Sequence, residues 1–303
     1  MKIAVQIFGH LRTFKECFPF LKKNLLDKYD CDVFMHTWDT IDHSTKTWHN
    51  NFMPNTNDNV ELIKEDLISL YKIKKLKIEH QNPVNLGVIN AIGKDISIYG
   101  MRCMFHSMKQ ANKLREEYQI ETGEKYDFVI TLRPDLQMLE DFSFEHYLER
   151  MTEEEINKSF FTYFFPMIGL WNDLKKIGAS DILFFARPNV ISNIFANFDY
   201  LIDKIKPITI NFGPEAYFLE LVESLEYNVK LIKYAQNTEF LIKRPNSKDS
   251  IKKNKNIKIK ISLKNINIFL FRNLNFQLIS FKLHLFNNSF NLRFSIGRNG
   301  NEF

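Results

Sequence analysis

The chain opens with alternating hydrophobic and polar positions and then changes to a helical spacing. Over residues 2–8, Ile3, Val5 and Ile7 fall on one side, which predicts a buried strand. Residues 14–29 then carry apolar side chains three and four positions apart, which is typical of an amphipathic helix. The chain therefore begins with a strand, a short turn and a helix.

The same two periodicities recur as far as residue 234. We expect further strands at 32–37, 76–80, 127–132, 160–165, 181–186 and 229–234, and helices at 59–71, 98–118, 189–205 and 214–226. The strands alternate with helices at spacings too long for hairpins, which favours parallel strand pairs. The pattern predicts an α/β fold, an open twisted sheet flanked by helices, with the polar segment 39–58 as a loop over a site.

Composition excludes several classes of protein. The 303 residues are 45% hydrophobic and 25% charged, which is ordinary for a globular chain. The three scattered cysteines argue against a disulfide framework and against a Cys-rich zinc site. No run reaches the roughly 18 apolar residues of a membrane-spanning helix, and no signal peptide is recognisable. We expect a cytoplasmic protein.

Charge is unevenly distributed along the chain. Residues 242–303 hold 13 Lys and Arg against 2 Asp and Glu, a net charge of +11. Residues 1–241 therefore carry a net charge of −6, and the overall charge of +5 comes from the C-terminal segment. We expect a domain at 1–242 and a basic, Phe- and Ile-rich tail at 243–303. The tail either packs on the body as core or binds an anionic membrane surface, at the inner face of the cytoplasmic membrane. Nucleic acid is not expected as a partner, because the acidic body would repel it.

Familiar ligand-binding and catalytic motifs do not occur in the sequence. There is no G-x-x-x-x-G-K-[ST], no G-x-G-x-x-G after the first strand, and neither H-E-x-x-H nor G-x-S-x-G. A site must therefore be assembled at the carboxyl ends of the strands, where open α/β sheets bind ligands.

Two groups of polar residues follow the first two strands. Gly9 allows close backbone approach, Arg12 can grip a phosphate, and Thr13 precedes a helix N-terminus that favours anions. After the second strand, Trp38 can stack on a base or sugar and Asp39 can hold hydroxyls. Each group also has a plain structural explanation, a strand–helix junction for the first and a covered sheet edge for the second.

Charged residues mark two further places. Arg133 and Asp135, with a proline between them, end a buried strand, where charges are costly to bury without a purpose. Asp181 begins a strand, and Glu215 begins a helix. Glu215 is either a helix-start carboxylate favoured by the dipole or a general base at the edge of the crevice.

A metal-dependent site is an alternative. The candidate ligands lie in the second strand and the loop after it: His36, Asp39, Asp42, His43 and His49. Their spacing fits no established ligand pattern. This alternative predicts a metal-dependent phosphate-group transferase or hydrolase, and a third hypothesis is a non-catalytic membrane-surface module.

Several of these motifs together resemble a known family. Gly9-x-Leu11-Arg12-Thr13, Asp32-Val33-Phe34-Met35-His36-Thr37-Trp38, the helix with Gly100-Met101-Arg102, and Tyr126-Asp127-Phe128 leading to Arg133-Pro134-Asp135 are similar to bacterial glycosyltransferases of capsule and lipopolysaccharide synthesis (WavE-like proteins). The similarity covers residues 1–235. That group resembles GT-A enzymes, which carry Asp-x-Asp at this strand end, whereas Arg133 replaces the first Asp here.

The resemblance implies an enzyme that takes a nucleotide-sugar donor and a glycan or lipid-linked acceptor. It implies that Gly9, Arg12 and Thr13 line the nucleotide or diphosphate, that Trp38 and Asp39 bracket the base or ribose, and that Arg102 and Arg133 offset diphosphate charge. Asp135 would contact the donor sugar or a Mn²⁺ or Mg²⁺ ion; the alternative is a metal-independent site, in which Arg133 neutralises the donor diphosphate in place of part of a metal's charge. Glu215 or Asp181 would deprotonate the acceptor hydroxyl.

Overall fold

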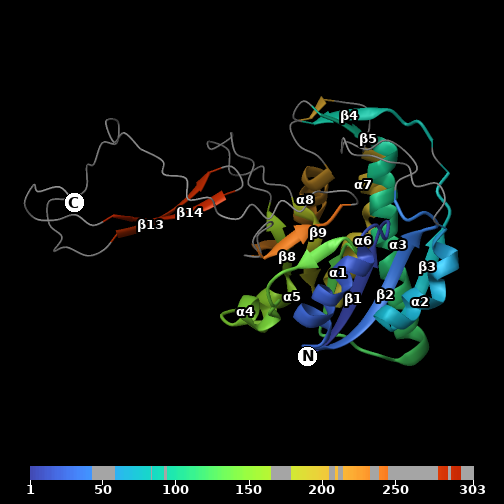
Figure 1. Cartoon of the computed structure of the whole chain (residues 1–303), viewed down its shortest axis with the longest axis horizontal. Helices are drawn as coiled ribbons and strands as arrows, with labels where there is room; N and C mark the ends of the chain where they lie inside the picture. Colours follow the sequence, from blue (N-terminus) through green and yellow to red (C-terminus); the bar gives the residue numbers. More distant parts are fainter. Residues whose placement is uncertain are drawn as a thin grey trace, which may run out of the picture. The chain divides into compact units, whose positions relative to one another are not determined.

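The computed structural model describes residues 1–42, 59–82, 84–91, 94–164, 179–204, 209–210, 214–232, 239–244, 279–285 and 288–294. The chain divides into two units, Met1–Ser247 and Lys248–Phe303 (Figure 1). The division falls a few residues beyond the expected boundary at 242/243, so the start of the predicted tail belongs to the first unit.

A seven-stranded sheet forms the centre of the first unit. Its strands, in spatial order, are β11 (Asn228–Leu231), β8 (Ser159–Phe164), β9 (Ala179–Ala186), β6 (Phe128–Leu132), β1 (Lys2–Phe8), β2 (Asp30–Trp38) and β3 (Ile73–Glu79). All run parallel except β9, which is antiparallel to both of its neighbours. The expected open α/β fold is confirmed, and the seven expected strands are the strands of this sheet.

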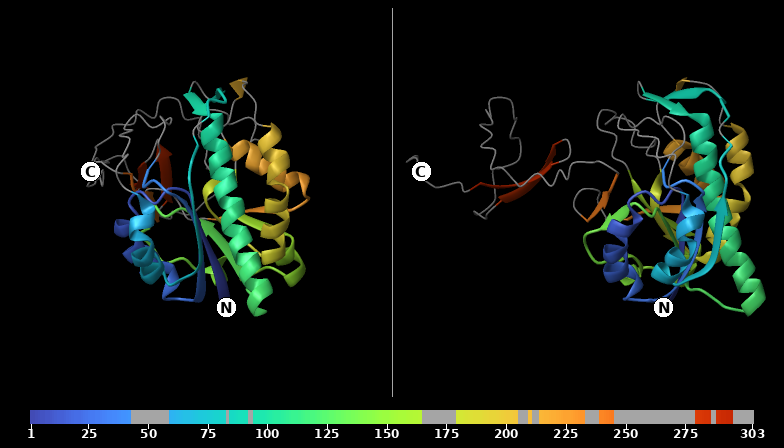
Figure 2. Two further views of the ribbon diagram at one scale, coloured as in Figure 1. Left: turned by 90° about the vertical axis from the view of Figure 1, so that its right-hand side faces the viewer. Right: turned by 45° about the vertical axis from the view of Figure 1, so that its right-hand side comes forward.

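Helices cover both faces of the sheet (Figure 2). One face packs against α1 (Phe14–Leu21) and α2 (Lys64–Tyr71), while the other packs against α3 (Ile98–Thr122), α6 (Pro188–Ala196), α7 (Phe198–Lys204) and α8 (Pro214–Ser224). Strand β1 shows why both faces are apolar. Ile3, Val5 and Ile7 join the first core, and Ala4 and Phe8 join the second, as expected for a parallel strand buried on both sides.

Helix boundaries differ from the expected ones where local signals intervene. A helix is expected over 14–29. In the structure α1 ends at Leu21 and is followed directly by a π-helical turn, Lys22–Leu26. The helix expected over 189–205 is two helices, α6 and α7, separated at Asn197. Helix α3 extends beyond the expected residue 118 to Thr122 and stops at Gly123, whose φ of 74° is the left-handed C-terminal cap that glycine favours.

Several short elements have no counterpart in the expected pattern. They are β4 (Val88–Ala91), β5 (Lys94–Ser97), β10 (Thr209–Ile210), β7 (Leu136–Met138), β12 (Phe240–Ile242), α4 (Phe144–Leu148) and α5 (Glu153–Asn157). The helix expected over 59–71 is present as a 3₁₀ turn, Val60–Ile63, that continues into α2. The antiparallel pair β7–β12 matters for the site, because it returns residues near 243 to the end of β6.

The second unit contains one described hairpin, in which β13 (Ile279–Leu285) pairs antiparallel with β14 (Asn288–Phe294). Among the described residues of either unit, no helix combines the length and the apolar character needed to cross a membrane.

Candidate functional site

The candidate site lies at the carboxyl ends of β1 and β6, which are neighbouring parallel strands. From β1 the chain continues to β2 and β3 on one side, whereas β6 leads toward β9 and β8 on the other. This reversal is the topological switch point at which open α/β sheets bind ligands. Gly9, with a φ of 93°, and Arg12, with a φ of 46°, bend the chain sharply just after β1.

Asp135 is the centre of a buried cluster of charges at this edge. Its carboxylate accepts hydrogen bonds of 2.9 and 2.6 Å from Arg133 and of 3.0 Å from Arg12. Arg244 lies 3.2 Å away. The Asp135 side chain is 0% exposed, and burial alone would raise its pKa; the charges of these arginines instead hold that pKa well below its usual range. Asp135 is therefore an ionised anchor for three guanidinium groups.

Arg244 reaches the cluster through the β7–β12 pair. Ile242 is opposite Leu136 in the register, so the chain after β12 runs back toward Asp135. The Lys243 backbone N–H donates to the Asp135 carbonyl at 2.8 Å, and the Thr13 hydroxyl donates to the Lys243 carbonyl at 2.6 Å. Arg244, expected to belong to the basic tail, is thus part of the site in the first unit. The one feature of the sequence that points to this placement is the short apolar run Phe240–Ile242, which forms β12 just before Arg244.

The surroundings of Asp135 do not fit a metal ion. Guanidinium N–H groups already bond both carboxylate oxygens, and a divalent cation would lie among three positive charges. Asp135 is also not among the residues that line the adjoining cavity. The geometry supports a positioning role for this carboxylate in place of the contact with a metal or donor sugar implied by the resemblance.

A cavity opens directly beside the arginines. Its lining includes Gly9, His10, Arg12, Trp38, Arg133, Asp181, Pro214 and Arg244. Arg12 also pairs with Asp42 at 2.9 Å. Burial, together with the charges of Arg133 and Arg12, lowers the pKa of Arg244. Arg12, Arg133 and Arg244 all line this cavity, and three guanidinium groups beside one cavity favour the binding of an anion such as a phosphate.

Two carboxyl groups with raised pKa values lie at the same edge. Burial raises the pKa of Asp181, and the charge of Arg133 only partly opposes this. Burial and the neighbouring Asp181 raise the pKa of Glu215 to about 8. Asp181 lines the cavity, whereas Glu215, in the first turn of α8, is not among the lining residues. A pair of carboxyl groups that share a site in this way can hold and release a proton near neutral pH.

A second cavity shares Trp38, Tyr99, Gln81 and Cys103 with the first. Arg102 lines this second cavity and not the first. The Trp38 ring stacks on His106 with centroids 5.9 Å apart and an interplanar angle of 27°. Trp38 is thus a wall common to both cavities, held in place by aromatic contacts.

The remaining expected site residues are placed differently. The Thr13 hydroxyl, just before α1, donates its hydrogen bond to the carbonyl of Lys243, just after β12, and Thr13 lines neither cavity. Asp39 also lines neither cavity, and its Oδ2 contacts His80. Of the residues expected as a loop metal site, His36, Asp39 and Asp42 each contact a different partner, and His43 and His49 lie outside the described residues.

No protein-family model matches the chain, and no curated protein matches its sequence. The chemistry of the site therefore has to be argued from its own residues. The site combines three arginines around a buried anchor, a cavity that these arginines line, and two carboxyl groups with raised pKa values. Such a site can bind a polyanion and transfer a proton beside it.

Proposed function

We propose that the chain is a glycosyltransferase that transfers a sugar from a nucleotide-sugar to a capsular polysaccharide or lipooligosaccharide acceptor. One observation carries the proposal: Arg12, Arg133 and Arg244, from three distant segments, converge on Asp135 beside a cavity at the topological switch point. The resemblance to GT-A glycosyltransferases of capsule and lipopolysaccharide synthesis supports the same assignment.

The arginine cluster suits the leaving group of such a transfer. When the bond between sugar and diphosphate breaks, negative charge grows on the diphosphate, and positioned guanidinium groups stabilise that charge. Arginine binds phosphate oxygens bidentately, which also fixes the orientation of the donor. In this proposal Arg12, Arg133 and Arg244 bind the diphosphate, and Asp135 holds their guanidinium groups in position without touching the donor.

The carboxyl pair suits the acceptor side of the reaction. The acceptor hydroxyl must lose a proton as its oxygen attacks the sugar carbon. Asp181, which lines the cavity, accepts that proton, and Glu215 shares it through their mutual interaction. A carboxylate whose pKa lies near the working pH is a better base than an ordinary surface carboxylate. Arg102 and Trp38 in the adjoining cavity bind the nucleoside or the glycan acceptor.

The basic tail suits a lipid-linked acceptor. Each Lys or Arg close to an anionic bilayer contributes about 1 kcal/mol to binding, and residues 248–303 hold 11 of them. In this proposal the tail binds the inner face of the cytoplasmic membrane and brings the catalytic domain to its acceptor.

Thermal denaturation of the purified chain with a panel of UDP-, GDP-, CMP- and dTDP-sugars tests the assignment. A true donor at 100 times its Kd stabilises the fold by about 2.7 kcal/mol, and the matching free sugar leaves the melting temperature unchanged. If inorganic phosphate is released from simple phosphate esters and no nucleotide-sugar binds, the alternative phosphate-group hydrolase is favoured.

A further inference from the structure

Three side chains outside the arginine cluster converge on one point. His36 Nε2 lies 3.0 Å and His106 Nε2 2.6 Å from the same oxygen, Oε2 of Glu79. The ligating atoms of all three residues lie within 4.8 Å of one another. Glu79 Oε1 contacts Lys77 on its other side, so Oε2 is the oxygen left for the two imidazoles.

Regular elements hold these three residues. His36 lies on β2 and Glu79 on the adjacent parallel strand β3, where Glu79 is opposite Trp38 in the register. His106 lies in the interior of the long helix α3. Placement on two paired strands and a helix fixes a set of ligands more firmly than placement on loops. The stacking of Trp38 on His106 restricts the imidazole further.

His36 also has the second contact that metal-binding histidines need. Its Nδ1 lies 2.7 Å from the Ser107 hydroxyl, which in turn accepts a hydrogen bond from the Gly9 N–H at 2.8 Å. Such a partner on the far nitrogen fixes the ring and the tautomer, so that Nε2 can present its lone pair. The His36 side chain is 0% exposed.

We propose that His36, Glu79 and His106 form a zinc site. Two histidines and one glutamate are a donor set of catalytic zinc centres, with Zn–N and Zn–O distances of about 2.0–2.2 Å. Tetrahedral ligands at such distances lie about 3.4 Å apart, so the two imidazoles need to separate only slightly from Glu79 to admit the ion. This site is distinct from Asp135, and it does not depend on the proposed sugar transfer.

The ion has an open side toward a cavity. Glu79 and His106 line the second cavity together with Arg102, and the His106 side chain is 41% exposed. Among the described residues, the buried Nε of Arg102 has no hydrogen-bond partner. A zinc ion with three protein ligands keeps a fourth position for water or substrate. The chemical class of ligand that fits both the ion and Arg102 is a small anion, a carboxylate or a phosphate.

Calorimetric titration of the chelator-treated full chain with Zn²⁺ tests the site. The expected result is one tightly bound ion per chain, with binding weakened at least about 100-fold in His106→Gln and in Glu79→Gln. Removing even an outer partner of a metal ligand costs 10–100-fold in affinity. Ser107→Ala therefore weakens binding by about 10-fold. Two controls retain wild-type binding: His80→Ala, in the same cavity, and His146→Ala, on α4.

Co²⁺ provides a readout that does not depend on affinity alone. Bound at this site it gives the intense visible bands of a four- or five-coordinate ion, and His106→Gln, a change at a partly exposed helix position, removes them while the helical circular dichroism stays unchanged. The proposal is wrong if zinc does not bind stoichiometrically, or if binding survives His106→Gln and Glu79→Gln unchanged.

Discussion

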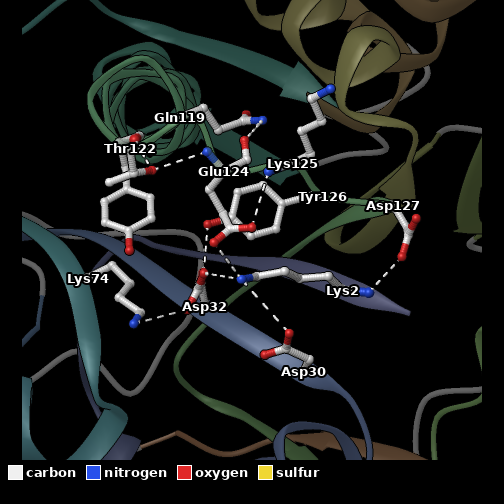
Figure 3. Close-up of polar contacts among 11 residues, drawn as sticks. Lys2, Asp30, Asp32, Lys74, Gln119, Thr122, Glu124, Lys125, Tyr126 and Asp127 are labelled. Atoms are coloured by element: carbon white, nitrogen blue, oxygen red, sulfur yellow. Dashed lines mark hydrogen bonds and ion pairs between the residues drawn. The ribbon is translucent and has the colours of Figure 1, made fainter.

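Charged residues gather at both ends of the central parallel strands. The two ends differ in how deeply the charged side chains are buried and in whether a cavity adjoins them. At the amino end, Lys2 Nζ lies 2.7 Å from Glu124 and 3.6 Å from Asp32, and Lys74 lies 3.3 Å from Asp32 (Figure 3). The side chains of Asp30 and Lys74 there are 69% and 42% exposed. At the carboxyl end, Asp135 is fully buried beneath three arginines.

The difference shows which cluster is suited to bind a ligand. At the amino end, Lys2 and Lys74 pair with acidic side chains whose exposure ranges from 8% for Asp32 to 69% for Asp30, and none of the residues labelled in Figure 3 lines either cavity. Pairs between solvent-exposed groups contribute about 0–1 kcal/mol each. At the carboxyl end, three arginines surround the buried Asp135 and line a cavity. An ion pair alone is therefore a weak indication of function, while several guanidinium groups held by one buried carboxylate beside a cavity are a strong one.

The largest expected effect is on stability, from removing the anchor of the carboxyl-end cluster. Asp135→Asn leaves three guanidinium groups without their shared partner and lowers the free energy of unfolding by about 3–5 kcal/mol, as breaking a buried pair does. Asp30→Asn, at the amino end, changes it by less than about 0.5 kcal/mol. Urea denaturation of both variants makes the measurement. Equal losses would mean that the two ends are equivalent.

The next effect is on catalysis. Arg133→Ala and Arg12→Ala each lower the rate of sugar transfer at least about 100-fold, because a lost charge-stabilising group commonly costs that much. Lys74→Ala, at the amino end, leaves the rate near that of the unmodified chain. Circular dichroism verifies that each variant is folded. Near-normal turnover in both arginine variants would place the reaction elsewhere in the molecule.

A smaller effect concerns pH, and its sign follows from the raised pKa of Glu215. A carboxyl group with a folded-state pKa of about 8 keeps a proton that the unfolded chain releases near pH 4.3. Stability therefore falls as pH rises through this range, whereas a base at this position becomes more active up to about pH 8. Glu215→Gln flattens both profiles. Melting curves and initial rates from pH 5 to 9 are the measurements, and an unchanged stability profile in Glu215→Gln would exclude this carboxyl group as the cause.

The smallest effect on the catalytic site comes from removing the second unit. A chain ending at Ser247 retains Arg244, still binds its donor and sediments less with anionic liposomes. A chain ending at Ile242 lacks Arg244 and loses donor affinity as well. Unchanged liposome binding by the chain ending at Ser247 would rule out the tail as a membrane anchor, and its failure to fold would make the tail structural.

Local patterns predicted the sheet and two of the three arginines of the cluster. Strands β1 and β6 are buried on both faces and mostly apolar, interrupted only by Gln6 and Thr131 after the first residue of β1, and Arg12 and Arg133 were found because they follow these strands closely. The orientation of Asp135 could not be predicted. Its sequence neighbour Arg133 suggested a charged site, but only the packing shows that the carboxylate points into the protein and away from the cavity.

Residues that enter the site through long-range pairing were not predictable. Arg244 lies at the site because β12 pairs antiparallel with β7, which precedes it by about 100 residues in the sequence. Strand β12 is only three residues long. Glu79 and His106 meet His36 from a neighbouring strand and from α3. No periodicity within a single segment encodes such meetings, because they depend on sheet order and register.

The central claim is that the arginine cluster binds a diphosphate, and calorimetric titration with the nucleoside diphosphate of the donor found in the nucleotide-sugar panel tests it most directly. The account predicts one site per chain, at least about 100-fold weaker binding in Arg133→Ala, and unchanged affinity in Lys74→Ala. Equal affinity in the unmodified chain and Arg133→Ala, or binding of the nucleoside as tight as that of its diphosphate, would contradict it.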